Sequence, residues 1–490
     1  MGLDPFLVLA VFKNTLFEAG AVVRKLIKEA KVTYLDELAE LLAIIKGLRL
    51  VEAGSEGDLA EFDLRHTSLA GLGRQGLRDR AASLFLGGHL EAKASKPAAS
   101  SARKPTALDK IKLTLPSSRT RLHALRAKLE DAPSSDPEEM AGIASTCWTK
   151  VWSRRVLTEE SISPDDYFGD YQLHIPVGLT PVRPGVGDME DAILQSNNSV
   201  AGPDGIPFAA WRATSRFGAP VLLLVMTSLM DGVLPPDGFN YGLLFLIPKT
   251  GTLLPEDTRP ISVTNSDNRI IAKAIVAAIT PALLVMLHRS QKGFISTRVF
   301  EDHIRDLNER FYEMAEGTDP PGSLPSGRNL YVLFMDTAKA FDSIDHVFVH
   351  EAIRRTGLPD WFGRLVVGLL HSVKVKPAFK GASDHWIDIL RGVKQGCPLS
   401  PLLFVICYDV LLRRLAELDG VDPFACADDL ALAAANLLAL WEPMRLVDRF
   451  RLASGLGINK GKTSILSARE SATLRHTLLS SPWPEVSVSL

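Results

Sequence analysis

The sequence predicts an α+β protein in which an antiparallel sheet is backed by helices. Residues 330–335 form a short apolar run rich in Val, Leu and aromatic residues, which is typical of a strand buried on both faces. Residues 424–432 form a second apolar run, and the acids Asp428 and Asp429 divide it into strand, acidic tip and strand. Long stretches with apolar residues at helical spacing separate these strands and predict the helices.

Composition limits the class of protein. With 490 residues, 46% hydrophobic and 23% charged, the chain is long enough for two or more domains and has the balance of a soluble globular protein. A formal net charge of -2 neither demands nor excludes a polyanionic partner. The four cysteines form no CxxC pair, which excludes a zinc knuckle, and their sparseness fits a reducing compartment.

Residues 1–90 are expected to form a helical N-terminal region. Apolar residues recur at helical spacing from residue 5 to about residue 50, and the first residues lack the basic segment of a signal peptide. The segment Gly71–Gly76 matches GxGxxG as text. No strand precedes it, so a dinucleotide site is not favoured.

Residues 91–139 indicate a basic linker rich in Pro and Ser, which is either a solvated tether or a salt-sensitive contact with nucleic-acid phosphates. Ten Lys and Arg residues between 92 and 128 face one acid, Asp109. Residues 140–198 are expected to be a further helical segment. Its first helix carries Trp148 and Trp152 at i,i+4, a spacing that favours a core stripe over a base-stacking platform.

Two stretches are apolar enough to raise the question of a membrane. Val221–Met230 is too short to span a bilayer, and Ile270–Leu287 carries Lys273 and Pro281. We therefore expect both to be core helices and expect no membrane partner.

Two cations follow predicted strands in the middle of the chain. The run 243–247 leads to Lys249, and Arg259 opens a second strand that continues to Val263. An antiparallel pair of this kind could clamp a triphosphate, although either cation alone is ordinary surface charge. A helix over 208–234 precedes these strands. Helices over 270–288 and up to about residue 315 follow them, and then a Gly/Pro/Ser-rich loop at 317–328.

The remaining elements surround the two acidic strand ends. Asp336 closes the strand at 330–335, and a lone acid there would most simply be a helix cap or a solvated loop residue. Downstream we expect a helix capped by Asp345, a helix over 360–372, a hairpin (373–379 and 386–390), a turn-rich loop (392–401), helices over 402–418 and 437–452, a turn over 455–463, and a strand at 464–466. The last two dozen residues carry no clear signal.

Asp336 and Asp428 each end an apolar strand, so their carboxylates converge if the strands are neighbours in one sheet. Converging carboxylates suit hard divalent cations, above all Mg²⁺, and two such ions serve in-line phosphoryl transfer. Lys249, Arg259 and Lys462 would then neutralise a triphosphate. Gly396 would let the backbone approach a substrate closely.

The order of these motifs resembles the reverse transcriptase domain of non-LTR (LINE-type) retrotransposons. The blocks are FxDxxKAFDSIDH at 334–346, GVKQGCPLSPLLF at 392–404, ADD at 427–429 and GLGINKGKT at 455–463. The upstream segments AGPDGIP, LIPKTG, RPISVTN and QKGF resemble the fingers blocks of that family, so the resemblance covers roughly residues 199–466. It implies a right-hand polymerase with fingers (199–328), palm (329–468) and a tail (469–490), and with the thumb absent or truncated.

The resemblance also implies an activity. It is that of an RNA-directed DNA polymerase, which adds dNTPs to a DNA primer 3′-OH on an RNA template with two Mg²⁺ ions, for which Mn²⁺ substitutes, inside the cell. By position, Asp336, Asp428 and Asp429 would be the catalytic metal ligands, and Lys462 a general acid on the pyrophosphate side. The nucleotide-binding residues would be Lys249 and Arg259 on the triphosphate, Phe341 against a ribose 2′-OH, and Gln395 and Gly396 in the nucleotide and template pocket.

This sequence departs from the family pattern at Cys426, where Phe or Tyr usually precedes ADD near the primer end. No endonuclease, RNase H or Cys/His block is found either. The alternative is therefore a catalytically impaired nucleic-acid-binding relic or a domesticated fragment. An RNA-dependent RNA polymerase shares the chemistry, and Phe341 argues against it.

Overall fold

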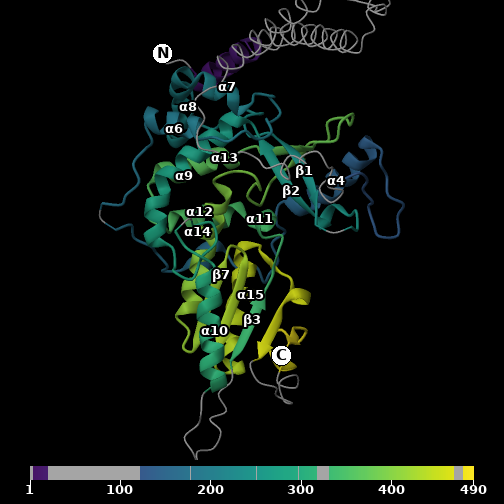
Figure 1. The fold of residues 1–490 in the computed structure, drawn as a ribbon, viewed down its shortest axis with the longest axis vertical. Coiled ribbons are helices and arrows are strands. Elements are labelled where there is room, and N and C mark those ends of the chain that lie inside the picture. The colour runs from purple at the N-terminus through teal and green to yellow at the C-terminus, as the bar shows by residue number, and fades with distance from the viewer. Residues whose placement is uncertain are drawn as a thin grey trace, which may run out of the picture. The chain divides into compact units, whose positions relative to one another are not determined.

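Helices and short strands alternate along the described part of the chain in the computed structural model (Figure 1). The structure describes residues 4–19, 122–176, 178–249, 251–295, 297–316, 330–467 and 478–489. Residues 1–13 and 118–490 form one compact unit, and residues 14–117 form a second, of which only 14–19 are described. The GxGxxG text, most of the predicted N-terminal helices and most of the basic linker lie outside the described residues.

A five-stranded sheet carries the two acidic strand ends. Its order is β11-β10-β3-β8-β7. The pairs β10–β3, β3–β8 and β8–β7 are antiparallel, and β11 is parallel to β10. The strands are β3 (Tyr331–Met335), β7 (Val421–Cys426), β8 (Asp429–Ala434), β10 (Ser464–Ser467) and β11 (Ser487–Ser489). The predicted strands are confirmed, and β11 lies where the sequence carried no signal.

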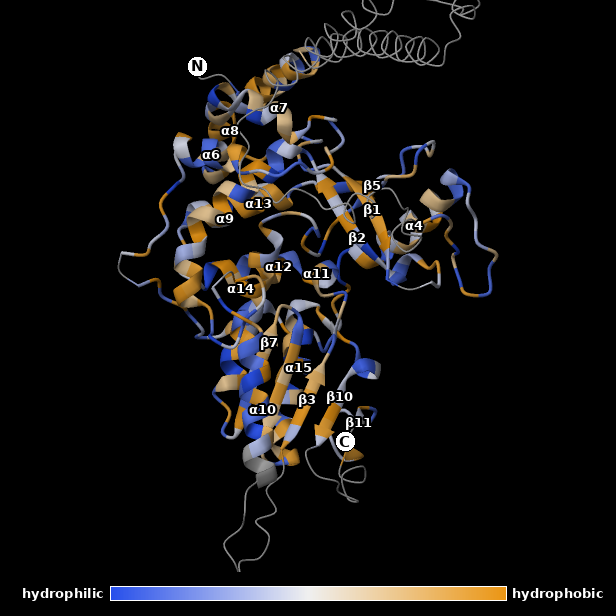
Figure 2. Ribbon diagram, viewed as in Figure 1, coloured by the Kyte–Doolittle hydropathy of each residue, from blue (hydrophilic) through white to orange (hydrophobic). Residues whose placement is uncertain are grey.

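Both faces of this sheet are covered, which explains its nearly continuous apolar strands. Val332, Ala431 and Ala433 turn to one face, where Leu307 and Phe311 of α10 (Glu301–Glu316) pack on them. Leu333 and Leu432 turn to the other face and are fully buried. On that side lie α12 (His346–Arg354), α14 (Ser400–Ala416) and α15 (Trp441–Ser454). Figure 2 shows the apolar strands of this sheet beside the largely polar α10.

A second sheet has the order β2-β1-β5-β6 and is covered by a helix from far upstream. Its strands are β1 (Gly242–Pro248), β2 (Thr258–Thr264), β5 (Lys374–Pro377) and β6 (Ile387–Asp388), and β1 pairs antiparallel with β2 and parallel with β5. The helix is α4 (Pro137–Trp152), capped by Asp136. Trp148 and Trp152 pack with Leu244 and Val375, so the predicted tryptophan core stripe is confirmed.

A group of helices packs beside this second sheet: α6 (Val186–Leu194), α7 (Phe208–Ala213), α8 (Ser215–Met230), α9 (Ser266–Met286) and α13 (Asp360–Leu370). The single helix expected over 208–234 is wrong, because Thr214 leaves helical backbone angles and divides it into α7 and α8. Among the described helices, α9 alone has the length and composition to cross a membrane. Because 56% of that window is buried inside the protein, it is better explained as a core helix.

The N-terminal helix, residues 5–19, begins against this group of helices. Phe12 packs on Trp211, with ring centroids 5.5 Å apart. The Lys13 ammonium lies 2.7 Å from Asp204 and 2.9 Å from Asp267, whose side chain is fully buried. An uncompensated charge at this depth would be costly, so the three charged groups depend on one another.

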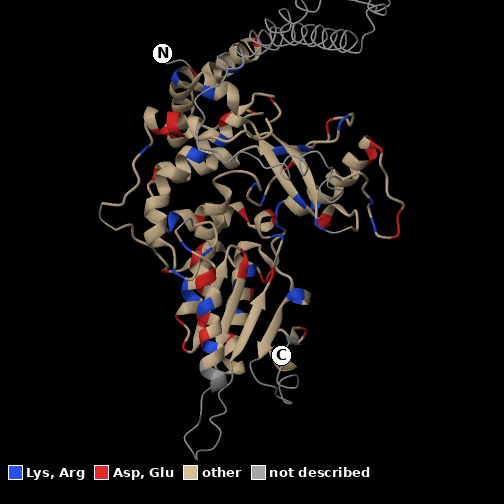
Figure 3. Ribbon diagram, in the orientation of Figure 1, with Lys and Arg blue, Asp and Glu red and all other residues tan. Residues whose placement is uncertain are grey.

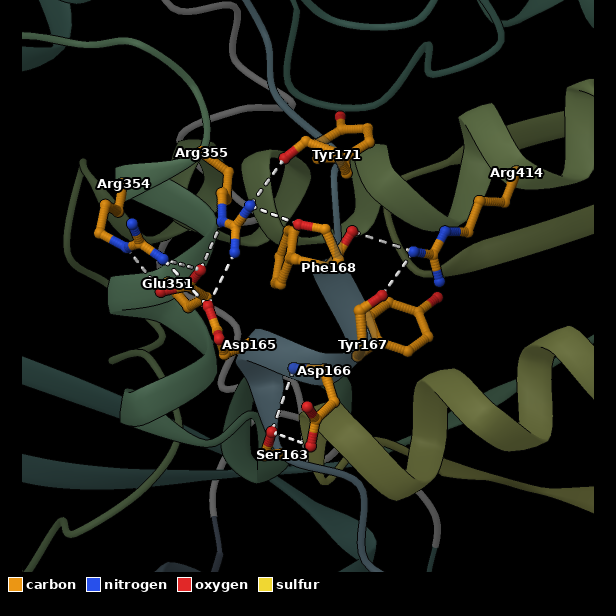
Figure 4. Close-up of polar contacts among 11 residues, drawn as sticks. Ser163, Asp165, Asp166, Tyr167, Phe168, Tyr171, Glu351, Arg354, Arg355 and Arg414 are labelled. Carbon is orange, nitrogen blue, oxygen red and sulfur yellow. Dashed lines mark hydrogen bonds and ion pairs between the residues drawn. The ribbon is translucent and has the colours of Figure 1, made fainter.

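A short segment around α5 (Pro164–Phe168) binds the helices behind the five-stranded sheet together (Figure 4). Tyr167 and Phe168 are buried against Phe348 of α12, and Arg414 of α14 donates to the carbonyls of both residues. Arg355 donates to the Gly169 carbonyl at 2.5 Å and pairs with Asp165 at 2.8 Å. Tyr167 and Phe168 are therefore part of the core, and the exposed residues around them are bonded to α12.

Arg355→Ala should destabilise the protein more than Arg354→Ala, although both arginines pair with Glu351 and Asp165. The Arg355 side chain is 13% exposed and also holds backbone carbonyls, whereas that of Arg354 is 62% exposed. We expect Arg355→Ala to lower the free energy of unfolding by roughly 2 kcal/mol and Arg354→Ala to have a much smaller effect. Urea unfolding measures both, and equal losses would contradict this account of the α5 segment.

Candidate nucleotidyl-transfer site

The site is built where β3 and β8 lie side by side. Met335 pairs with Leu430 as the last pair of the antiparallel ladder, so one further step places Asp336 opposite Asp429. Cys426 pairs with Asp429 across the β7–β8 turn, which brings Asp428 to the same end of the sheet. The Thr337 hydroxyl donates to the Asp428 carbonyl at 3.0 Å and links the two strand ends directly. The expectation that the strands are neighbours is confirmed.

The three carboxylates repel one another. Burial, and then the Asp429 and Asp336 charges, raise the pKa of Asp428. Burial and the Asp336 charge raise the pKa of Asp429. The Lys462 ammonium, in the turn before β10, lies 3.6 Å from an Asp336 oxygen. Figure 3 shows acidic residues gathered at this end of the sheet, with a basic turn nearby.

The donor set fits a hard divalent cation in its chemistry. All three side chains offer carboxylate oxygens, they repel one another, and a cation would relieve that repulsion. Within the described residues, no group of three or more His, Cys, Asp or Glu is already arranged to hold a metal ion. Any ion would therefore have to draw the carboxylates together.

The loop after β6 is hydrogen-bonded to the turn that follows Asp336. Val393 donates to the Phe341 carbonyl and Gly392 to the Ile344 carbonyl, both at 2.7 Å. The Gln395 amide donates to Asp342 at 2.8 Å. Gly392 has a φ of +85°, and a Cβ there would meet the Asp342 carbonyl oxygen at 2.7 Å. Glycine is therefore required at this crossing.

The same loop is bonded to the edge of β2. The Ser262 N–H donates to the Gln395 carbonyl at 2.7 Å. Gly396 is exposed, has a φ of +112°, and a Cβ there would meet the Ser262 carbonyl oxygen at 2.7 Å. Gln395 and Gly396 therefore lie between α11 and β2, and the loop is bonded to both.

Phe341 lies in the short helix α11 (Ala340–Ser343), between two other rings. It stacks on Phe404 of α14 with centroids 4.9 Å apart, and Phe294 meets it edge-on at 5.7 Å. Stacking of this kind restrains the ring. Its position in the turn after Asp336 is thereby stabilised.

Lys249 and Arg259 lie on the β1–β2 hairpin, as predicted. Arg259 pairs with Ile247 in the ladder, and the Lys249 N–H donates to the Asp257 carbonyl at 2.9 Å. Both side chains are exposed. The Lys249 charge lowers the pKa of Asp428 and Asp342, which places it on the side of the acids.

Cys426 opens into an apolar cavity of about 570 Å³ beside the acids. Phe300 and Phe311 of the α10 region and Phe334 and Phe424 of the sheet line it, with Asp336 and Asp429 at its edge. Burial and the two neighbouring acids raise the pKa of the Cys426 thiol. A protonated thiol therefore occupies the place where an aromatic ring was expected.

Sequence reasoning gave no role to Asp342, which is 4% exposed beneath the site. The Trp152 indole of α4 and the Gln395 amide both hydrogen-bond to its carboxyl group, and Lys339 and Lys249 face it. Burial raises its pKa to about 7 in spite of these contacts. The sequence shows an acid at position 342, but only the packing of α4 against α11 shows that this acid is buried.

Comparisons with known proteins find relatives of this chain. Residues 247–478 match the family model "Reverse transcriptase (RNA-dependent DNA polymerase)". This stretch is similar to reverse transcriptases, and its sequence relatives include polyproteins of retrotransposable elements. The Pol polyprotein of the type-1 retrotransposable element R2 of Nasonia vitripennis is 27% identical over 301 residues, which cover 58% of this chain and 27% of that protein. The type-2 element R2DM polyprotein of Drosophila melanogaster is 30% identical over 280 residues, which cover 54% and 25%.

The chain spans about a quarter of the length of these curated relatives. A solved telomerase from Candida tropicalis, in complex with a fragment of telomeric RNA, is 14% identical. The match covers 54% of this chain and 45% of the telomerase chain, at a TM-score of 0.36. The assignment of the domain rests on the sequence matches.

Asp342→Asn should change how stability depends on pH. The pKa of Asp342 is about 7 in the folded protein and 3.8 in the unfolded chain. The contribution of Asp342 to the free energy of unfolding of the wild type therefore falls as the pH rises from about 4 to about 7, and is constant outside this range. The amide cannot ionise. We expect the free energy of unfolding of the variant, relative to wild type, to rise by on the order of 2 kcal/mol between about pH 5 and pH 8. Urea unfolding of both proteins across this pH range measures the difference in free energy. A difference that does not vary with pH would refute the raised pKa of Asp342.

Proposed function

We propose that this chain is the polymerase part of an RNA-directed DNA polymerase of a non-LTR retrotransposon. It would add dNTPs to the 3′-OH of a DNA primer on an RNA template. The observation that carries the proposal is the β3–β8 pairing, which sets Asp336 opposite Asp429 with Asp428 in the adjoining turn. In this proposal the five-stranded sheet is the palm, and the sheet of β1 and β2 with its helices is the fingers.

Asp336, Asp428 and Asp429 would hold two Mg²⁺ ions, or Mn²⁺ in their place. When bound, such ions stabilise both the attacking and the leaving oxygen of an in-line phosphoryl transfer. The protein itself would position the reactants and neutralise charge, which is most of what this chemistry requires. Lys249 and Arg259, exposed on the hairpin, would contact the incoming triphosphate.

Three further groups would complete the nucleotide site. Phe341, restrained by Phe404, would exclude a ribose 2′-OH. Gln395 and Gly396 would line the nucleotide and template pocket from a loop bonded on both sides. The Lys462 side chain is 71% exposed and lies 3.6 Å from Asp336. In this proposal its ammonium would move from that carboxylate and contact the leaving pyrophosphate.

A non-catalytic nucleic-acid-binding relic is the second candidate, and Cys426 is the observation that favours it. A thiol in the apolar cavity beside the acids offers a primer terminus less surface than an aromatic ring. Salt-sensitive RNA binding without incorporation in Mg²⁺ or Mn²⁺ would support the relic, and template-dependent incorporation would exclude it.

Asp336→Asn should abolish primer extension. Loss of one proposed metal ligand should lower the rate by more than about 100-fold, since even the groups that only orient a ligand cost 10–100-fold. The assay extends a DNA primer on an RNA template with dNTPs and Mg²⁺. Asp422→Asn is the matched control, because Asp422 lies on β7 of the same sheet, at the end away from the β7–β8 turn, and pairs with Arg310. Undiminished extension by Asp336→Asn would overturn the proposal.

Phe341→Ala should relax the choice of sugar. Without the ring, the ratio of rNTP to dNTP incorporation should rise by roughly 10- to 100-fold, a range typical of a steric gap in an apolar pocket. Single-nucleotide incorporation measures kcat/KM for each sugar. Phe348→Leu, in the core of α12, should change stability without changing this ratio. A wild-type preference for rNTP would instead favour an RNA-dependent RNA polymerase.

A further inference from the structure

A short segment, residues 290–293, runs beside the strand that leads to the acids. The Ala425 N–H donates to the Ser290 carbonyl at 2.9 Å, and the Lys292 N–H donates to the Ala425 carbonyl at 2.8 Å. Gln291 thereby forms a parallel bridge with Ala425. Lys292 also pairs with Asp302 at 3.2 Å, and the His303 ring contacts the Ser290 carbonyl at 2.8 Å. The segment is therefore fixed both to β7 and to the start of α10.

The Gln291 side chain is bonded to the turn that carries the acids. It is 1% exposed. Its amide oxygen accepts from the Ala427 N–H and from the Gly293 N–H, each at 2.8 Å. Its amide nitrogen donates to the Ala427 carbonyl at 3.2 Å. One buried amide thus bonds both backbone polar groups of the residue directly before Asp428.

Ala427 needs such support because its backbone is strained. Its φ is +59°, a left-handed conformation that costs an L-residue other than glycine roughly 1–2 kcal/mol. Strained residues persist where the surroundings hold them, and they cluster at functional sites. The strain here lies in the turn that sets the direction of two of the three acids.

Gly293 packs directly against the Ala427 backbone. A Cβ at Gly293 would lie 2.1 Å from the Ala427 nitrogen and 2.7 Å from its Cα. No side chain fits there. The Gln291 amide and the bare Gly293 backbone together enclose Ala427, so the turn cannot relax without moving this segment.

We propose that Gln291 is a positioning residue for the acids: its amide holds Ala427 in the left-handed conformation, so that Asp428 and Asp429 face Asp336 and share a divalent cation with it. This inference rests on the proposed function and extends it to a residue that touches neither the nucleotide nor the metal.

The test compares two isosteric variants of the whole chain. Gln291→Met keeps the volume and removes all three hydrogen bonds. Asn240→Leu is the matched control: Asn240 is also 1% exposed and donates to the Gly368 and His371 carbonyls, among residues outside the site. Three quantities are measured: Mn²⁺ affinity by electron paramagnetic resonance, kcat and KM for dNTP in primer extension, and the midpoint of thermal unfolding.

We expect Gln291→Met to weaken Mn²⁺ binding by about 10-fold and to lower kcat by 10- to 100-fold, with little change in KM for dNTP. High Mn²⁺ should restore part of the rate. Asn240→Leu should lower the unfolding midpoint and leave Mn²⁺ affinity unchanged. If the two variants change only the unfolding midpoint, the Gln291 amide is merely structural and the inference is wrong.

Failure of the proposed function gives a different result. A wild-type chain that binds Mn²⁺ and incorporates no nucleotide would refute the polymerase, while the effect of Gln291→Met on Mn²⁺ affinity would still decide the positioning role. A wild-type chain that binds no Mn²⁺ would overturn the inference, because there would be no ion for the acids to share.

Discussion

The site depends on the antiparallel pairing of β3 with β8. Each strand ends at an acid, and the register that pairs Met335 with Leu430 brings those ends together. A slip of one residue would turn Leu333 and Leu432 out of the core, so burial on both faces enforces the register. Hydrophobic packing thereby provides the energy that holds mutually repelling carboxylates side by side, a placement that their own electrostatics oppose.

Around this pairing, the loops that carry the other site residues are bonded mainly through their backbones. The loop of Gln395 is tied to α11 on one side and to Ser262 of β2 on the other. The turn of Asp428 is held by Thr337 and by Gln291. Glycines occur where these chains cross at distances that exclude a Cβ, as at Gly293 and Gly392. Close backbone approach therefore orders these loops.

Segments upstream of the reverse transcriptase match are part of the same structure. Trp152 of α4 reaches the buried Asp342, and Trp148 lies under the Lys339 ammonium at 4.9 Å. The α5 segment joins α12 to α14 through Arg355 and Arg414 (Figure 4). These contacts bury aromatic rings and pair charges. Residues 137–171 therefore stabilise the core that surrounds the strands carrying the acids.

The sequence by itself determined the elements that depend on local pattern: the apolar strands, most helices, the tryptophan stripe, and the order of motifs that marks Asp336, Asp428 and Asp429. Local periodicity and turn chemistry suffice for these. Only the tertiary structure decided that Asp342 is buried, that β5 of the later segment joins the sheet of β1, and that the Gln291 side chain is hydrogen-bonded to the acidic turn. Burial, register and strain arise from contacts between residues far apart in the sequence, such as Gln291 and Ala427, and no local pattern in the chain encodes them.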